Sequence, residues 1–155
     1  MTAVYGTAYV DQLIDSRSYE AMAMLGAHME AAAPAPDQPD LGLPAPLFVY
    51  LEALTWFAQS VRSGAWTYFE ATPHPRQQAM RDNLLALDCD CWRERYVFGM
   101  DHWADEASMA ELDRWIDASE PEQETWLLQL LDTHRDRLKQ LLCRAAHLHL
   151  SEPDA

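Results

Sequence analysis

Positively charged residues are scarce in this sequence. Eleven Lys and Arg stand against 25 Asp and Glu, which leaves a formal net charge of −14. Such a charge repels nucleic acids and anionic membrane surfaces, so direct binding of either is excluded as a function. Two interpretations of the acidic residues are left: they bind a basic protein partner, or they only keep the protein in solution.

Long apolar runs and a secretory leader are also missing. The most apolar stretch, residues 47–61, is too short to span a bilayer, and its Glu52 must face solvent or find a hydrogen-bonding partner. Residues 1–15 contain no Lys or Arg before an apolar run, so no secretory signal is expected. Three cysteines cannot all pair within the chain, and Cys89 and Cys91 are too close to bridge easily. We therefore expect a cytoplasmic protein in a reducing compartment.

Motifs typical of enzymes and metal sites are absent as well. There is no glycine-rich phosphate loop, no nucleophile elbow and no pair of histidines four residues apart on a helix. Cys89 and Cys91 form only one cysteine pair, whereas structural zinc usually needs two separated ligand pairs. His147 and His149 diverge by about 200° on a helix. We expect no catalytic residue, no metal and no cofactor. The alternative is a small enzyme with a carboxylate or metal site near the cluster Asp101, His102 and Cys91.

The residues that are present favour helices. The chain has five Gly among many Ala, Leu and Met, and no segment alternates strictly between apolar and polar residues. Apolar spacings of three and four, together with proline and capping signals, predict the first helices at 8–14, 16–32, 47–62, 72–87 and 91–103. The 47–62 segment is apolar on most sides, so it is expected to be the central helix.

Two capping boxes mark the later helices. Ser108 is followed by Glu111, and Ser119 by Glu122, each three residues on. The second box opens the longest predicted helix, whose apolar stripe ends near Leu148. An exposed stripe on this last helix would make the chain a structural oligomerisation domain, which is a further alternative.

These signals predict an all-α fold: an irregular multi-helix bundle of about six to eight helices in a single domain covering residues 1–155. One segment differs in composition. Residues 33–46 hold five of the nine prolines together with Gly42, which predicts a surface loop within the domain.

The distribution of the acidic residues is the main clue to function. Nine Asp and Glu fall within the 24 residues from Asp101 to Glu124, where Arg114 is the only basic residue. Acids in the first turn of a helix are favoured by the helix dipole, but like charges four residues apart cost about 0.2–0.5 kcal/mol each when exposed. Several of these acids have no evident benefit for folding. We predict that a basic partner binds Asp101, Asp105, Glu106, Asp113 and Asp117.

Residues 47–83 resemble part of a bacterial family of small acidic helical proteins that mimic DNA. That family is marked by an aromatic-rich helix, an Asn-Gly-Gly-Phe turn and a Tyr-Phe pair. Here the turn reads Ser63-Gly64-Ala65-Trp66, with Phe69 at the place of the tyrosine and Glu70 at that of the second aromatic residue. Gly64 is the one identical turn residue. The match covers about a quarter of the chain and includes the following helix, 76–87.

The resemblance implies a helical domain whose carboxylates imitate phosphates and occupy a nucleic-acid-binding protein. Related domains also serve as immunity proteins that neutralise toxins. We therefore predict a non-enzymatic inhibitor of immunity-protein or DNA-mimic type, whose partner is a basic protein, either a toxin or a nucleic-acid-binding protein. A homodimer is compatible with this prediction.

The turn at Gly64 has a physical interpretation of its own. A glycine that follows a long apolar helix is able to take a positive φ and close the helix with a left-handed cap. We expect this conformation at Gly64, with Trp66, Tyr68 and Phe69 packed across the turn.

Overall fold

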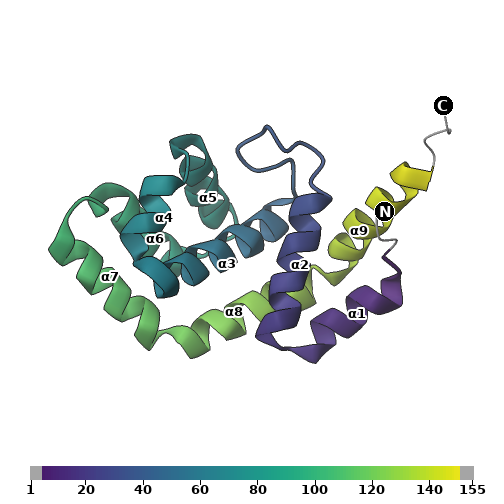
Figure 1. Ribbon diagram of the computed structural model, residues 1–155, viewed down its shortest axis with the longest axis horizontal. Coiled ribbons are helices and arrows are strands. Elements are labelled where there is room, and N and C mark those ends of the chain that lie inside the picture. Colours follow the sequence, from purple (N-terminus) through teal and green to yellow (C-terminus); the bar gives the residue numbers. More distant parts are fainter. Residues whose placement is uncertain (1–4, 151–155) are drawn as a thin grey trace.

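The computed structural model describes the backbone of residues 5–150 and the side chains of residues 5–143. Within that range the protein is a single all-α domain, which confirms the predicted fold class (Figure 1). Nine helices follow one another along the described chain: α1 (Thr7–Ser16), α2 (Tyr19–Ala31), α3 (Ala45–Ser63), α4 (Ala65–Ala71), α5 (His74–Ala86), α6 (Asp90–His102), α7 (Glu106–Ala118), α8 (Glu120–Thr133) and α9 (Arg135–Leu150). None of these helices is long and apolar enough to cross a membrane.

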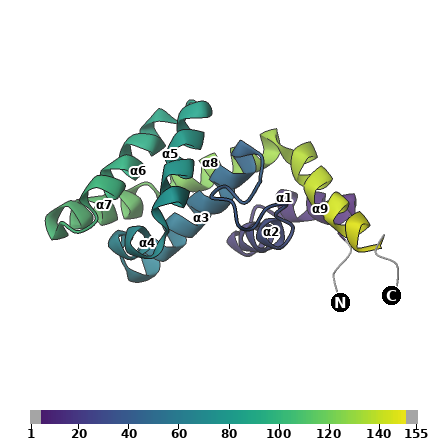
Figure 2. The same cartoon turned by 90° about the horizontal axis from the view of Figure 1, so that it is seen from above.

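Two features raise the number of helices in the described range above the predicted six to eight. The aromatic segment after Gly64 forms the short helix α4 rather than an irregular turn. The long helix predicted from Ser119 is interrupted at His134, whose φ of −113° and ψ of 23° end α8. Figure 2 shows α9 turning away from the axis of α8. The longest helix is therefore α3, with 19 residues.

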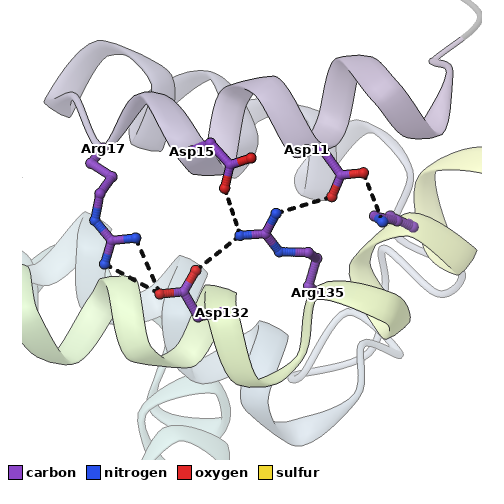
Figure 3. Close-up of polar contacts among 6 residues, drawn as sticks. Asp11, Asp15, Arg17, Asp132 and Arg135 are labelled. Atoms are coloured by element: carbon purple, nitrogen blue, oxygen red, sulfur yellow. Dashed lines mark hydrogen bonds and ion pairs between the residues drawn. The ribbon is translucent and has the colours of Figure 1, made fainter.

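Ion pairs hold the start of α9 at its junction with α8. Arg135, the first residue of α9, donates hydrogen bonds to Asp15 at 2.8 Å and to Asp11 at 3.1 Å, both on α1 (Figure 3). It also donates to Asp132 of α8 at 3.1 Å. Lys139 adds an ion pair to Asp11 at 2.8 Å, and its hydrogen bond, followed by that of Arg135, lowers the pKa of Asp11. These contacts tie the start of α9 to α1.

The central helix is α3, as its sequence predicts. Every residue from 46 to 54 is buried, so all sides of the first half of the helix are covered. Around it, α3 contacts α2, α4, α5, α7 and α8. The arrangement of the other helices therefore depends on this one apolar segment.

The proline-rich loop joins α2 to α3 and is shorter than predicted. It covers residues 32–44, because α3 begins at Ala45 and takes Pro46 into its first turn. Proline is tolerated in a first turn, where its missing N–H would have no partner within the helix. Leu41 and Leu43 of the loop are buried, so these two side chains anchor the surface loop to the core of the domain.

A buried carboxylate on α3 joins four helices. The Glu52 side chain is 1% exposed and accepts hydrogen bonds from Tyr68 of α4 and from Nε of Arg76 of α5, the latter at 2.8 Å. Because the Tyr68 hydroxyl gives its one proton to the ionised Glu52, it accepts from Tyr96 of α6 at 2.8 Å. Burial, together with the charge of Glu52, raises the pKa of Tyr68 well above its usual range. Of the two expectations for Glu52, the hydrogen-bonded one is therefore confirmed.

Aromatic packing fixes the position of α7 against the core. Trp115 of α7 lies over Trp56 of α3, with ring centroids 6.1 Å apart, and meets Trp92 of α6 edge-on at 5.5 Å. The guanidinium of Arg95 lies 5.2 Å from the Trp115 ring centroid, a cation–π contact. With α7 held in this way, Glu106, Glu111 and Asp117 lie on the exposed surface.

The buried hydrogen-bond chain makes a testable prediction for stability. Tyr68→Phe removes a donor from Glu52 and leaves the Tyr96 hydroxyl without its acceptor, so we expect the free energy of unfolding to fall by about 1–3 kcal/mol. Tyr96→Phe leaves both donors to Glu52 in place and is expected to cost less. Urea denaturation of the two variants measures the difference. Equal losses would contradict the direction assigned to the hydrogen bonds.

Candidate partner-binding surface

The five acidic residues predicted to bind a partner lie on α7 and next to it. Four of them are exposed, and the fifth, Asp113, is half-buried. They do not form one uniform face, because two of them have partners within the protein. The structural roles of Asp105 and Asp113 must be separated from any role in binding.

Asp105 is the N-cap of α7. Its carboxylate accepts hydrogen bonds from the Ser108 hydroxyl at 2.5 Å and from the Ser108 backbone N–H at 2.9 Å, and these bonds lower the pKa of Asp105. The predicted capping box of Ser108 with Glu111 is therefore wrong. An ionised carboxylate is favoured at this place by the exposed N–H groups and the positive end of the helix dipole.

The second predicted capping box is wrong as well. Ser119 precedes α8, but its side chain makes no capping bond and instead donates to the carbonyl of Ile116 at 3.4 Å. Gln123, rather than Glu122, reaches back: its amide donates to the Ser119 hydroxyl at 2.9 Å and to the carbonyl of Ile116 at 2.7 Å. Glu122 stays exposed.

Asp113 caps a helix other than its own. Its Oδ1 accepts a hydrogen bond from the backbone N–H of Ala65 at 2.8 Å, at the start of α4. Gly64 precedes α4 and has no side chain to cap it, so α7 supplies the acceptor. The expectation that Asp105 and Asp113 bring no benefit to folding is thus corrected. Within residues 5–143, Asp101, Glu106 and Asp117 make no hydrogen bond or ion pair through their side chains.

Gly64 lies between α3 and α4 in a conformation that favours glycine. Its φ of 92° confirms the predicted positive value, but its ψ of 146° lies outside the left-handed helical region, so the predicted left-handed cap is wrong. Its N–H closes α3 by donating to the carbonyl of Ser60 at 2.8 Å. A Cβ at this position would lie 3.1 Å from Cδ1 of Trp66, which shows how closely the indole approaches the glycine.

The other two aromatic residues of the turn pack into the core. Tyr68 and Phe69 are both 2% exposed, whereas Trp66 is 45% exposed. The ring of Phe69 fills the space beside Gly99 of α6, where any Cβ would overlap it. The prediction that all three side chains pack across Gly64 is therefore confirmed for Trp66, but it is wrong for Tyr68 and Phe69.

The turn supplies a second prediction for stability. Gly64→Ala forces alanine to a φ of 92°, so we expect a loss of about 1 kcal/mol or more in the free energy of unfolding. Gly6→Ala is the matched control, because Gly6 has a negative φ and no atom within 4 Å of an added Cβ. Thermal and urea denaturation measure both. If Gly64→Ala were as stable as the control, the glycine would not be needed for the turn.

A hollow beside α7 brings several of the predicted residues together. It has a volume of about 530 Å³ and is lined by Trp66, Trp103, Ala104, Glu106, Met109, Ala110 and Asp113. We call it the tryptophan hollow. Its α7 residues recur at spacings of three and four, which places them on one face of the helix. Because Ala110 is small, it leaves open space in front of this face.

The chemistry of the tryptophan hollow suits a positive charge carried on an apolar chain. Trp66 and Trp103 are 45% and 38% exposed, so their rings remain open to a ligand. Glu106 and Asp113 add two carboxylates to the lining. Aromatic rings attract cations to their faces, and the stems of Arg and Lys cover apolar surface.

A second and larger hollow lies between α3 and α8. This α3–α8 groove has a volume of about 640 Å³; its floor includes Met22, Leu54, Phe57 and Leu127, and Asp117 and Glu120 are on its rim. Asp117 therefore belongs to this groove, whereas Glu106 and Asp113 belong to the tryptophan hollow. Asp101 and Asp105 line neither.

The alternative site near Asp101, His102 and Cys91 is not assembled. Cys91 is near the start of α6 and His102 is its last residue, about 16 Å apart along the helix axis. The ring of His102 packs against Phe98, with centroids 5.0 Å apart. Among the side chains described, no group of three or more His, Cys, Asp and Glu residues is placed to hold a metal ion. His147 and His149 lie outside the described side chains.

The absence of a metal remains a prediction, with a direct test. Protein purified without a tag or chelator should contain less than a stoichiometric amount of zinc by elemental analysis, because the chain offers only one cysteine pair. Adding a chelator should leave the melting temperature unchanged. One equivalent of tightly held metal would favour the enzyme alternative.

The apolar stripe that would define an oligomerisation domain is largely covered. Leu127, Leu131 and Leu138 are buried, and Leu141 packs against the core. Leu148 lies outside the described side chains. The described part of the stripe thus belongs to the interior of one chain.

Comparisons of the chain with protein-family models, with curated proteins and with solved structures find no match. The resemblance of residues 47–83 to DNA-mimic proteins therefore stays a prediction, and the function must be argued from the residues themselves. The sequence patterns did not identify Trp103, Met109 or Ala110 as parts of a site. The spacing of Glu106, Ala110 and Asp113 could have shown that they share one face of a helix. The exposure of the two tryptophans could not be recognised from the sequence.

Proposed function

We propose that this protein is a non-enzymatic inhibitor that binds a basic protein partner through the tryptophan hollow and the acidic residues beside it, in the manner of an immunity protein or a DNA mimic. The observation that carries the proposal is the combination of two half-exposed tryptophans with the carboxylates of Glu106 and Asp113 in one hollow. The net charge of −14 supports a basic partner.

Exposed tryptophan is a good source of binding energy. Trp66 and Trp103 keep a large apolar area in contact with water, and tryptophan is among the residues that contribute most at protein interfaces. An arginine or lysine of the partner that enters the hollow would cover the rings with its stem and place its charge beside Glu106. Both classes of basic partner, a toxin and a nucleic-acid-binding protein, present such side chains.

The surrounding charge contributes to the rate of association. Asp101 and Glu106 are exposed and have no partner within residues 5–143, so they remain available to a basic surface. Complementary charge mainly accelerates association and orients the partner, and salt screens it over about 8 Å at physiological ionic strength. In a DNA mimic, these carboxylates would stand in for phosphates.

The first test places a cation in the hollow. The wild-type protein is immobilised and exposed to an extract of the cells in which it occurs naturally. A basic protein that it retains is identified and purified. Surface plasmon resonance then measures how tightly this partner binds each variant. Ala110→Lys fills the hollow with its own ammonium group and should weaken binding by at least about tenfold. Ala27→Lys is the control, because Ala27 is exposed, lies on α2 and lines neither hollow.

A second pair of variants separates the effect of charges near the tryptophan hollow on binding from the effect of the net charge. Asp101→Asn/Glu106→Gln and Glu30→Gln/Asp37→Asn each change the formal charge from −14 by +2, to −12. The first pair should slow association and flatten its dependence on salt more than the second. Binding that responds equally to both pairs, and that is untouched by Ala110→Lys, would show that the acidic residues serve solubility and that the hollow is not the site.

A further inference from the structure

The α3–α8 groove has exposed apolar side chains at its edges, above a floor of buried apolar residues. Phe57 of α3 and Leu127 of α8 form part of its floor. Tyr19, the first residue of α2, is 66% exposed, and Val61, near the end of α3, is 71% exposed. Both line the groove. Exposed apolar side chains that line one groove point to a site of interaction, whereas those scattered singly do not.

One rim of the groove is acidic. It is formed by Asp117, Glu120 and Glu124, at the junction of α7 and α8. The helix dipole favours Glu120 in the first turn of α8, but it disfavours Asp117, which lies next to the last residue of α7. None of the three makes an ion pair within residues 5–143. Arg62, the basic residue that lines the groove, donates to Gln59 at 2.8 Å.

These features restrict what can occupy the groove. A second copy of the chain would bring another net charge of −14 to an acidic rim, so charge opposes self-association there. A peptide that binds by adding a β-strand would need an open sheet edge, and residues 5–150 contain no strand. A helix with an apolar stripe, flanked by Lys or Arg, matches both the floor and the rim.

We infer that the α3–α8 groove is a second docking site, which binds a basic amphipathic helix of the protein partner. The apolar stripe of that helix contacts the exposed side chains of Tyr19 and Val61. Its basic flank faces Asp117, Glu120 and Glu124. This inference rests on the proposed function, because it names a segment of the same partner. It places the two contacts on different surfaces: a single cationic side chain in the tryptophan hollow, and a helix in the groove.

A synthetic helix provides the probe. A fluorescein-labelled peptide of about 16 residues carries Leu at positions i, i+3, i+4 and i+7, with Lys on either side of this stripe. A second peptide has the same composition in scrambled order. Fluorescence anisotropy should show that the amphipathic peptide binds at least about tenfold more tightly than the scrambled one. Equal binding of the two peptides would overturn the inference, because net charge alone would then account for it.

Variants locate the binding of the amphipathic peptide. Val61→Lys places a positive charge on the edge of the groove and should weaken binding by about tenfold or more. Leu85→Lys is the control, because Leu85 is 55% exposed on α5 and does not line the groove. Both positions are exposed, so the fold is retained, and a melting curve checks this. An unchanged affinity of Val61→Lys would overturn the assignment of the groove.

The acidic rim has its own matched comparison. Asp117→Asn/Glu120→Gln/Glu124→Gln and Asp37→Asn/Glu30→Gln/Glu94→Gln each change the formal charge from −14 by +3, to −11. The rim variant alone should flatten the salt dependence of peptide binding. If instead sedimentation shows that the wild-type chain forms a dimer that Val61→Lys dissociates, the occupant is a second copy and the inference fails.

Failure of this inference is distinguishable from failure of the proposed function. If the peptide does not bind the groove while Ala110→Lys still weakens the natural partner, the groove is rejected and the tryptophan hollow stands. If Val61→Lys weakens the peptide while Ala110→Lys leaves the natural partner unaffected, the groove stands and the hollow is rejected.

Discussion

The hydrogen bonds of Glu52 are the constraint on which most of the fold depends. Burying a carboxylate is costly unless other groups bond to it, and here Tyr68 of α4 and Arg76 of α5 donate to it. Tyr96 of α6 extends the network by bonding to the Tyr68 hydroxyl. A shift of α4 or α5 against α3 would remove a donor from the carboxylate, and a shift of α6 would leave the Tyr96 hydroxyl without its acceptor. The network therefore limits how these four helices can be arranged, whereas apolar packing alone would tolerate more than one arrangement.

The two ends of the molecule are held by different forces. Around α4 to α7, the contacts are buried rings and the Glu52 network, which water and salt hardly reach. Around α1, α8 and α9, the ion pairs of Arg135 are partly exposed, and such pairs contribute little individually and are screened by salt. The tryptophan hollow lies at the well-buried end, so its geometry depends on the stronger set of contacts.

The sequence predicted the parts of the fold that local patterns determine. The apolar run of α3 identified the central helix, and the glycine after it indicated a positive φ. Features that depend on distant residues were missed. After the break at His134, the start of α9 is bonded through Arg135 to Asp11 and Asp15, which are more than a hundred residues earlier in the chain. The short helix α4 depends on a cap from another helix.

The acidic residues show the same limit more clearly. A local capping pattern pointed to Ser108, but Asp105, three residues earlier, is the stronger acceptor for the first turn of α7. Like-charge spacing suggested that Asp113 has no role in folding, because the N–H of Ala65, 48 residues earlier, cannot be recognised as its partner from spacing alone. For the candidate site, sequence identified the acidic helix and Trp66 but did not show that Trp103 and Ala110 complete the hollow.

The bond between Asp113 and Ala65 has a consequence for recognition. It joins the two walls of the tryptophan hollow, because Asp113 is on α7 and Ala65 is next to Trp66 on α4. The close approach of the Trp66 indole to Gly64 restricts the ring further. The site is therefore preorganised: its conformational entropy is lost when the protein folds and not when a partner arrives. For the cationic side chain proposed as the ligand, the shape of the hollow is set before binding, so cations of different shape would fit it unequally.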